Sequence, residues 1–251
     1  MSTLKPLRKP AAKPIPRGGT RAAGGGGRSI AIFVALLAVV GIGIATMVII
    51  GRGNGSIAPS AVSVEEAVRP LNAPTGQTPE GFWYKGQADA PVTVVVYGDF
   101  QCPACRAAFL RIEGELDRTY VDTGKIKFVY HDFPLSIHPN AGPAAQAARA
   151  AGTQGKFWQM HDLLYARQDE WADDRQVVDR LKSYAAELGL DQQAFDRAMD
   201  DKEYAPVIAA AASAGAKQGI NSTPTYLVDG NKTDVGTLST AIDAALRAKG
   251  R

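Results

Sequence analysis

The pattern of hydrophobic and polar positions predicts four short strands. Residues 92–97, VTVVVY, form a β-branched apolar run of the kind found in central parallel strands. Apolar residues alternate with other residues over 125–131, which predicts a second strand. A third strand is predicted at 225–228, and the Asp229-Gly230 turn signal after it predicts a hairpin. The last strand, 231–234, is short and polar, which is typical of a sheet edge.

Helical periodicity fills the rest of this region. A helix is predicted to begin at Pro103, since proline fits the first helical position. Its apolar stripe at helical spacing consists of Phe109, Ile112, Leu116 and Tyr120. An alanine-rich helical block then runs from about 138 to 219, and a closing helix spans 238–248. Breaks in the block are predicted at 152–155, 171–174 and 189. The predicted order is β-α-β, a helical block, a β-hairpin and a final helix.

Residues 30–50 form an uncharged apolar run without a polar face. At about 1.5 Å per residue, this run covers the ~30 Å hydrocarbon core of a bilayer. It is longer than the core of a signal peptide, which is usually about 7–15 residues. We therefore expect a transmembrane anchor. Cleavage after the small residues 56–58, SIA, is the alternative.

The charge pattern gives this anchor a direction. Seven basic and no acidic residues precede residue 30, whereas Arg52 follows the apolar run directly. Positive charge stays on the cytoplasmic side, so the N-terminus is predicted inside and the C-terminal part outside. The resulting organisation is a basic, disordered tail over 1–29, the anchor over 30–50, a flexible linker over 51–79 and a globular domain over 80–251. Without the tail the chain is mildly acidic, which gives no reason to expect nucleic-acid binding.

The chain has two cysteines, Cys102 and Cys105, separated by Pro-Ala. A bridge across so short a loop would constrain the unfolded chain little, so stability does not explain the pair. Cys102 falls at the predicted helix start, where free N–H groups favour a thiolate and the pKa of such a thiol drops to about 3.5–7.5. Cys105 lies on the apolar stripe. We expect Cys102 to be an exposed attacking nucleophile and Cys105 the buried resolving thiol.

A zinc site and an inert structural pair are the two alternative interpretations of the cysteines. A zinc site needs two more ligands, and the available imidazoles, His131, His138 and His161, lack paired spacing. An inert structural pair is the second alternative. Neither explains a Cys-x-x-Cys that directly follows an apolar strand and opens a helix. We expect no metal and no cofactor.

Two further features of the sequence are a proline before a strand and an aspartate just before the cysteines. Proline at 224 precedes an apolar strand, and a cis Thr223–Pro224 bond would explain it; a trans proline at the strand entry is the alternative. Asp99, three residues before Cys102, is a candidate for passing a proton to or from Cys105. The alternative for Asp99 is a solvated loop residue or a cap on nearby backbone.

These motifs together resemble the DsbA-type branch of the thioredoxin superfamily. The resemblance rests on YGDFQCPAC at 97–105, HDFPL at 131–135, QGKFWQMHDLL at 154–164 and GINSTPT at 219–225, and it covers residues 80–251. It implies an α/β thioredoxin fold, preceded here by one transmembrane helix.

The same resemblance implies that an all-helical insertion, about 138–218, interrupts the thioredoxin core. It also implies that Cys102 forms mixed disulfides. Thr223 and Pro224 would lie beside the dithiol and hold an extended substrate segment by main-chain pairing.

The function implied is an extracytoplasmic thiol–disulfide oxidoreductase at the bacterial plasma membrane. It would oxidise cysteines of exported polypeptides and be reoxidised by a quinone-linked membrane partner. Strongly oxidising members carry Pro-His between the cysteines, so Ala104 predicts a less oxidising site. A reductase or isomerase fed by a membrane electron donor is the alternative. A non-catalytic tethered binding module is a third reading, against which the intact cysteines argue.

Overall fold

A computed structural model describes residue 65, residues 68–69 and residues 71–251. All of them fall within one unit, Pro59–Arg251. The predicted tail, the predicted anchor at 30–50 and most of the predicted linker lie outside the described residues. Among the residues that are described, no helix has the length and apolar character needed to cross a bilayer.

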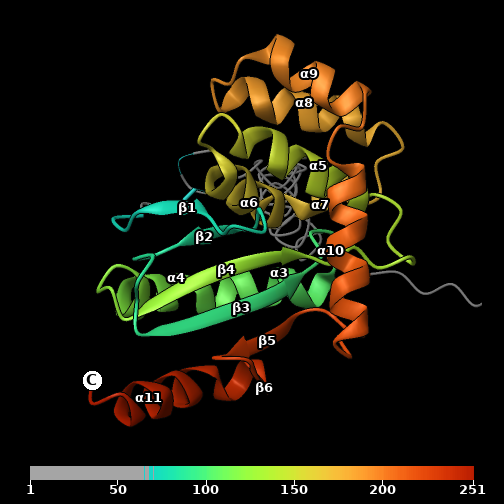
Figure 1. Ribbon diagram of the computed structural model, residues 1–251. Helices are drawn as coiled ribbons and strands as arrows, with labels where there is room; N and C mark the ends of the chain where they lie inside the picture. Colours follow the sequence, from blue (N-terminus) through green and yellow to red (C-terminus); the bar gives the residue numbers. More distant parts are fainter. Residues whose placement is uncertain (1–64, 66–67, 70) are drawn as a thin grey trace, which may run out of the picture. The chain divides into compact units, whose positions relative to one another are not determined.

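A six-stranded mixed sheet forms the centre of the domain (Figure 1), in the order β1-β2-β4-β3-β5-β6. The strands are β1 Thr75–Gln77, β2 Trp83–Lys85, β3 Val92–Gly98, β4 Ile126–Asp132, β5 Thr225–Val228 and β6 Asn231–Thr233. Strands β3 and β4 are parallel, and the other neighbours are antiparallel. All four predicted strands are confirmed. The predicted hairpin is confirmed too, with Asp229 and Gly230 both at positive φ and β6 at the sheet edge.

The globular domain begins earlier in the sequence than the predicted residue 80. Strand β1 lies inside the segment predicted as a flexible linker, and it pairs with β2. Contacts reach back further, since the backbone N–H groups of Arg69 and Asn72 donate to the carboxylates of Asp162 and Asp122, each at 3.1 Å. The folded domain therefore begins before residue 80.

One continuous helical stretch follows β3, made of α3 Pro103–Ala108, η1 Phe109–Glu113, α4 Gly114–Leu116 and η2 Asp117–Val121. The helical insertion lies between β4 and β5, as expected. It comprises α5 Ala141–Gly152, α6 Phe157–Ala166, α7 Gln168–Trp171, α8 Val177–Glu187, α9 Gln192–Asp200 and α10 Ala205–Lys217. The chain ends with η3 Val235–Thr237 and α11 Leu238–Ala248, which has the predicted bounds. The predicted breaks are confirmed, and a further break separates α9 from α10.

The two faces of β3 belong to different cores. Val94 and Val96 point into the main core, which also holds Phe109 of the helical stretch and Ile242 of α11. Tyr97 faces the opposite way, into a smaller cluster that packs against α10. Figure 1 shows α10 crossing the sheet on the side opposite α3 and α4. Side chains alternate between the two faces of β3. The face that carries Val94 and Val96 is therefore the one that packs against the helical stretch after β3.

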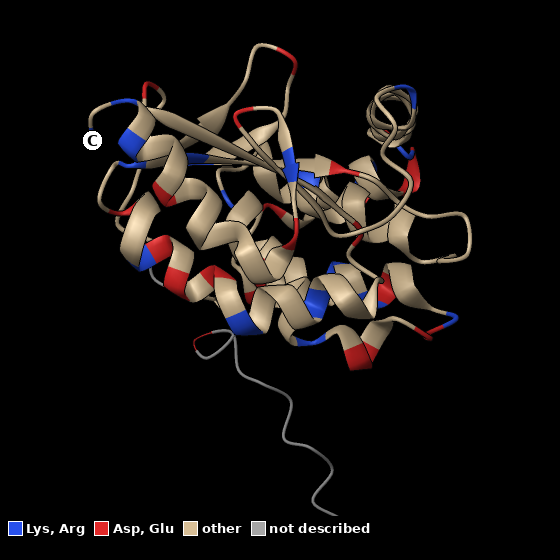
Figure 2. Cartoon of the chain, turned by 90° about the horizontal axis from the view of Figure 1, so that it is seen from below, with Lys and Arg blue, Asp and Glu red and all other residues tan. Residues whose placement is uncertain are grey.

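The outer helices carry charges of both signs, which Figure 2 shows interspersed along the helical surface. Helices α8 and α9, for example, are joined by an exposed ion pair between Lys182 Nζ and Asp200 Oδ1, 2.7 Å apart. Exposed pairs of this kind contribute about 0–1 kcal/mol each. They accompany the packing of the insertion rather than determine it.

Two π-helical turns, η1 and η2, change the face that the helical stretch buries. Ile112, predicted on the apolar stripe, is only partly buried, while Glu113 is 3% exposed. A π turn holds one extra residue, so it rotates the residues that follow. As a result Glu113 and Asp117 face inward, where Lys85 Nζ lies 3.4 Å from Glu113 Oε2 and 2.7 Å from Asp117 Oδ1.

Candidate active site

Strand β3 ends in a turn that presents the two cysteines. The Cys102 N–H donates to the Asp99 carbonyl at 3.1 Å, and Cys102 is the N-cap of α3 with Pro103 in the first turn. Both cysteines are free thiols. Cys105 is buried as predicted, but Cys102 is only 6% exposed, so the expectation of an exposed sulfur was wrong. The segment before β5 lies against this sulfur.

That segment contains Thr223 and Pro224, and the peptide bond between them is cis, as the sequence suggested. The structure places Thr223 directly at the dithiol, because the Cys102 thiol donates to the Thr223 carbonyl oxygen at 3.5 Å. The Thr223 hydroxyl is buried without a well-formed hydrogen bond to any described residue. It is therefore free to donate to a sulfur that becomes negative.

The surroundings of the two sulfurs drive their pKa values apart. The pKa of Cys102 is lowered to about 5, chiefly by a hydrogen bond from the Cys105 thiol, against the opposing effect of burial. The Thr223 hydroxyl and the N–H groups of Cys105 and Ala104 lower it further. The pKa of Cys105 is raised well above its usual value, first by burial and then by its bond to the Cys102 sulfur. At neutral pH the reduced site thus holds one thiolate, on Cys102, and one thiol.

Asp99 is 1% exposed, and its carboxylate is bonded away from the cysteines. One oxygen accepts the Gln101 N–H at 2.8 Å, and the other accepts the Leu135 N–H at 2.9 Å and contacts His138 Nδ1 at 2.7 Å. It is the backbone N–H of Asp99, rather than its carboxylate, that hydrogen-bonds the Cys105 sulfur. The side chain ties the active-site turn to the loop after β4, and its proton-transfer role stays a prediction.

Two glutamines from different segments hold the same turn, and sequence reasoning missed both. Gln168 of α7 donates to the carbonyls of Phe100 and Cys102, at 2.6 and 3.2 Å. The Gln101 side chain donates to the Ala172 carbonyl at 2.7 Å. The helical insertion therefore fixes the backbone on which the nucleophile sits. No spacing in the sequence signals contacts across so many positions.

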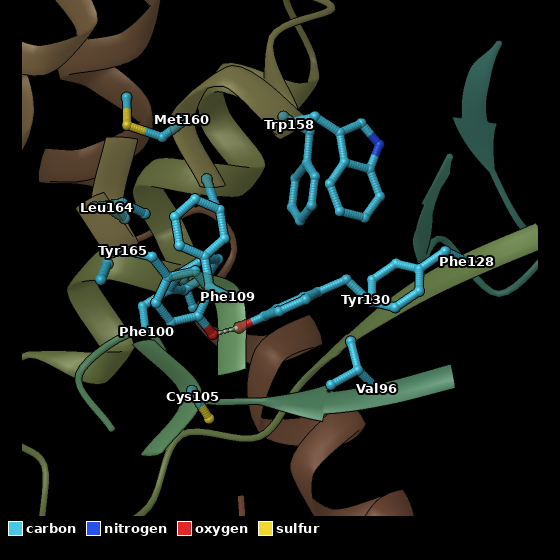
Figure 3. Close-up of a cluster of buried hydrophobic side chains, with 14 of the residues drawn as sticks. Val96, Phe100, Cys105, Phe109, Phe128, Tyr130, Trp158, Met160, Leu164 and Tyr165 are labelled. Carbon is cyan, nitrogen blue, oxygen red and sulfur yellow. Dashed lines mark hydrogen bonds between the residues drawn. The ribbon is translucent and has the colours of Figure 1, made fainter. Parts of the chain in front are cut away.

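Cys105 lies in the main core together with aromatic side chains (Figure 3). Phe100 stacks on Tyr130 with ring centroids 5.0 Å apart, and the hydroxyls of Tyr130 and Tyr165 are hydrogen-bonded at 2.9 Å. Gly98 makes this arrangement possible, since a Cβ there would lie 2.5 Å from the Tyr130 hydroxyl. These apolar surroundings explain why burial is the first cause of the raised Cys105 pKa.

The imidazoles considered for zinc have other partners. His131 stacks on Phe82 at 3.6 Å between centroids, His138 contacts Asp99, and His161 Nδ1 lies 2.9 Å from Asp162 Oδ1. Within the described ranges, no group of three or more His, Cys, Asp or Glu residues is placed to hold a metal ion.

Comparison with known sequences gives a family match and relatives of two kinds. The profile of a family described as Thioredoxin matches residues 77–246. The probable disulfide bond formation protein D of Bacillus anthracis is 30% identical over 169 residues, which cover 64% of this chain and 77% of that protein. Na(+)/H(+) antiporter NhaA 1 of Salinispora arenicola is 36% identical over 195 residues, which cover 75% of this chain. This chain spans only 28% of the antiporter's length.

Solved structures share the fold. Oxidised BdbD from Bacillus subtilis superposes with a TM-score of 0.62 at 24% identity, covering 70% of this chain and 99% of that one. The thiol-disulfide oxidoreductase MdbA from Corynebacterium diphtheriae gives a TM-score of 0.61 at 18% identity, covering 72% of this chain and 98% of that one. At these identities the likeness concerns the arrangement of the strands and helices.

Proposed function

Because the chain belongs to the thioredoxin family, as a DsbA-type thiol–disulfide oxidoreductase, we propose that it oxidises cysteines of exported polypeptides through a Cys102–Cys105 disulfide. The observation that carries the direction is the place of the Cys102 sulfur at the start of α3, beside Cys105 and Thr223, which lowers its pKa to about 5. A stabilised thiolate stabilises the reduced protein, and a stable reduced form makes the disulfide a good oxidant.

The proposed reaction has two exchange steps. A substrate thiolate attacks the Cys102 sulfur of the disulfide, and Cys105 leaves with the electron pair. Since the pKa of Cys105 is raised, this sulfur takes up a proton. A second substrate thiolate then attacks the substrate sulfur of the mixed disulfide, and Cys102 leaves as a thiolate. The substrate dithiol is oxidised, the enzyme disulfide is reduced, and the second substrate proton goes to solvent.

The side chains around Cys102 support a moderate rather than an extreme oxidant. Ala104 is exposed and contributes only its backbone N–H to the Cys102 sulfur. A histidine side chain at that position would add a donor and positive charge, both of which favour a thiolate. The Thr223 hydroxyl supplies part of that stabilisation from the other side.

The location is proposed from the sequence. The apolar run 30–50 and the basic residues before it support a single anchor with the domain outside the cytoplasm. There a quinone-linked membrane oxidase would reoxidise the dithiol. Protease added to intact spheroplasts should digest the domain and spare an N-terminal tag. An accessible N-terminal tag would contradict this topology.

The direction of exchange is tested by equilibrating the protein with defined ratios of reduced and oxidised glutathione. An oxidant should remain largely reduced at ratios where a thioredoxin-like reductant is already a disulfide. A strongly reducing equilibrium would instead favour the reductase or isomerase alternative.

A further inference from the structure

Asp99 contacts both cysteines through its backbone. Its carbonyl oxygen accepts the Cys102 N–H at 3.1 Å, and its own N–H hydrogen-bonds the Cys105 sulfur. A shift or rotation of this one residue would therefore change the surroundings of the nucleophile and of the resolving thiol together. The groups that hold Asp99 in place thus bear on the chemistry of both sulfurs.

The loop after β4 holds the Asp99 carboxylate. Oδ2 contacts two groups of this loop, the Leu135 N–H at 2.9 Å and His138 Nδ1 at 2.7 Å. Oδ1 accepts the Gln101 N–H at 2.8 Å, within the active-site turn. Because a carboxylate only accepts hydrogen bonds, His138 Nδ1 is the donor in its contact. Of these three donors, only the imidazole is a side chain, so it is the one that a substitution can remove.

His138 is itself fixed by the residues on either side of it. Its N–H donates to the Leu135 carbonyl at 2.9 Å, which closes a turn. Two residues further on, the Asn140 N–H donates to Gln101 Oε1 at 2.7 Å, and the Asn140 side chain donates to three backbone carbonyls of the insertion. The imidazole is therefore held in position towards the carboxylate.

The contact also concerns charge. The Asp99 side chain is 0% exposed, and that of His138 is 16% exposed. A buried carboxylate that loses a donor is left with negative charge that is less well compensated. Negative charge close to a thiolate disfavours it, and Asp99 lies only three residues before Cys102. Removing the imidazole donor should therefore weaken the Cys102 thiolate and make the disulfide a poorer oxidant.

We propose that His138 is a positioning residue of the dithiol: by donating to the Asp99 carboxylate, it fixes the backbone groups of Asp99 against both cysteines and favours the reduced form. Its effect passes through Asp99 rather than through a sulfur. The inference rests on the proposed function and deepens it, because it names a residue that tunes the same site.

The first test compares three replacements of His138. His138→Asn keeps a donor near the position of Nδ1, whereas His138→Leu and His138→Ala remove it, so the test survives if one of these two fails to fold. In the donor-free variants the equilibrium with glutathione should move about threefold or more towards the disulfide, a coupling usual for contacting residues. The Cys102 pKa, followed by alkylation rate against pH, should rise in the same variants. His138→Asn should stay close to the unaltered protein. An equal shift in all three variants, or no shift in any, would overturn the proposal.

The second test asks whether His138 acts through Asp99. Asp99→Asn removes the charge that the imidazole compensates, and His138→Leu is then added to it. In that background His138→Leu should shift the glutathione equilibrium little further, since both substitutions remove the same interaction. Shifts that simply add would overturn the proposal. A reducing equilibrium of the unaltered protein would reject the proposed function instead, while the differences among the variants would still report on His138.

Discussion

The Cys102 thiol donates a hydrogen bond to the Thr223 carbonyl oxygen, 3.5 Å away across 121 positions of sequence. The contact joins the start of α3 to the segment that enters β5. It also brings the Thr223 hydroxyl to the nucleophile, where it lowers the Cys102 pKa. Thr223 thus contacts the protonated Cys102 sulfur through its backbone carbonyl and the ionised sulfur through its hydroxyl.

Thr223→Val should raise the Cys102 pKa by about one unit, because a hydrogen bond to a charged group contributes ~1.5–3 kcal/mol. The disulfide should become correspondingly less oxidising. Thiolate absorbance against pH measures the first effect and glutathione equilibrium the second. Thr233→Val on the edge strand β6 is the matched control. An unchanged pKa in Thr223→Val would show that the hydroxyl does not reach the thiolate.

The stability difference between the two redox forms should depend on pH. The Cys102 pKa is about 5 in the folded reduced protein against 9.0 for an ordinary cysteine. The stabilisation is therefore complete above the ordinary value and lost as pH falls through about 5. Cys105, with its raised pKa, stays protonated in this window. The reduced form should melt above the disulfide form at neutral pH, and the gap should close towards pH 5.

Comparing the reduced and disulfide forms cancels the effect on stability of titrating groups that both forms contain. His131 has its pKa lowered to about 4 by burial and the charge of Arg149, so acid destabilises both forms through this residue. Subtracting the two melting curves leaves the cysteine effect. A disulfide form that is the more stable at neutral pH would count against the oxidant function.

Replacing Cys105 should separate its two roles. Both Cys105→Ala and Cys105→Ser remove the resolving thiol and should accumulate mixed disulfides with substrates. Only serine keeps a donor towards Cys102, and the Cys105 hydrogen bond is the first cause of the low Cys102 pKa. The pKa of Cys102 should therefore rise more in the alanine variant. Alkylation rates against pH report it, and equal profiles would assign the low pKa to the helix start and the Thr223 hydroxyl instead.

The buried ion-pair cluster of Lys85, Glu113 and Asp117 should be required for stability. Lys85 is 2% exposed, and the carboxylates of Glu113 and Asp117 hold its pKa above the usual value even though burial opposes this. Lys85→Met leaves those carboxylates without their lysine partner and should cost about 3–5 kcal/mol in denaturant unfolding. Lys182→Met, which breaks an exposed pair, should cost about 1 kcal/mol or less.

A companion variant shows whether unpaired charge is the cause. Adding Glu113→Gln and Asp117→Asn to Lys85→Met should recover a large part of the lost stability, since no buried carboxylate then lacks a partner. If the triple variant is less stable than Lys85→Met, packing of the lysine stem rather than charge is responsible.

The sequence predicted the parts of this fold whose pattern is local. The run 92–97 is long and β-branched enough to identify β3, and the Asp229-Gly230 turn fixes the hairpin that follows β5. The position of Cys102 at the helix start followed from its place between a strand and a proline. In each case the residues that identify the element lie next to one another in the sequence.

The parts that were missed depend on neighbours in space. Strands β1 and β2 have three residues each, too few to show a period. The stripe through Ile112 assumed a regular helix, and the π turns moved Glu113 inward instead. The contact between Asp99 and His138 crosses 39 positions, so nothing local could indicate it.

The helical insertion lies between β4 and β5 in the sequence, so β5 is synthesised much later than β3 and β4. Strand β5 pairs with β3 only after more than a hundred intervening residues have emerged and collapsed, and pairing over such distances is slow. Until then Cys102 has a helix start beside it but no Thr223. A chain in which β5 has not yet paired with β3 would carry an untuned cysteine pair. The full depression of the Cys102 pKa would therefore be acquired last, when folding is complete.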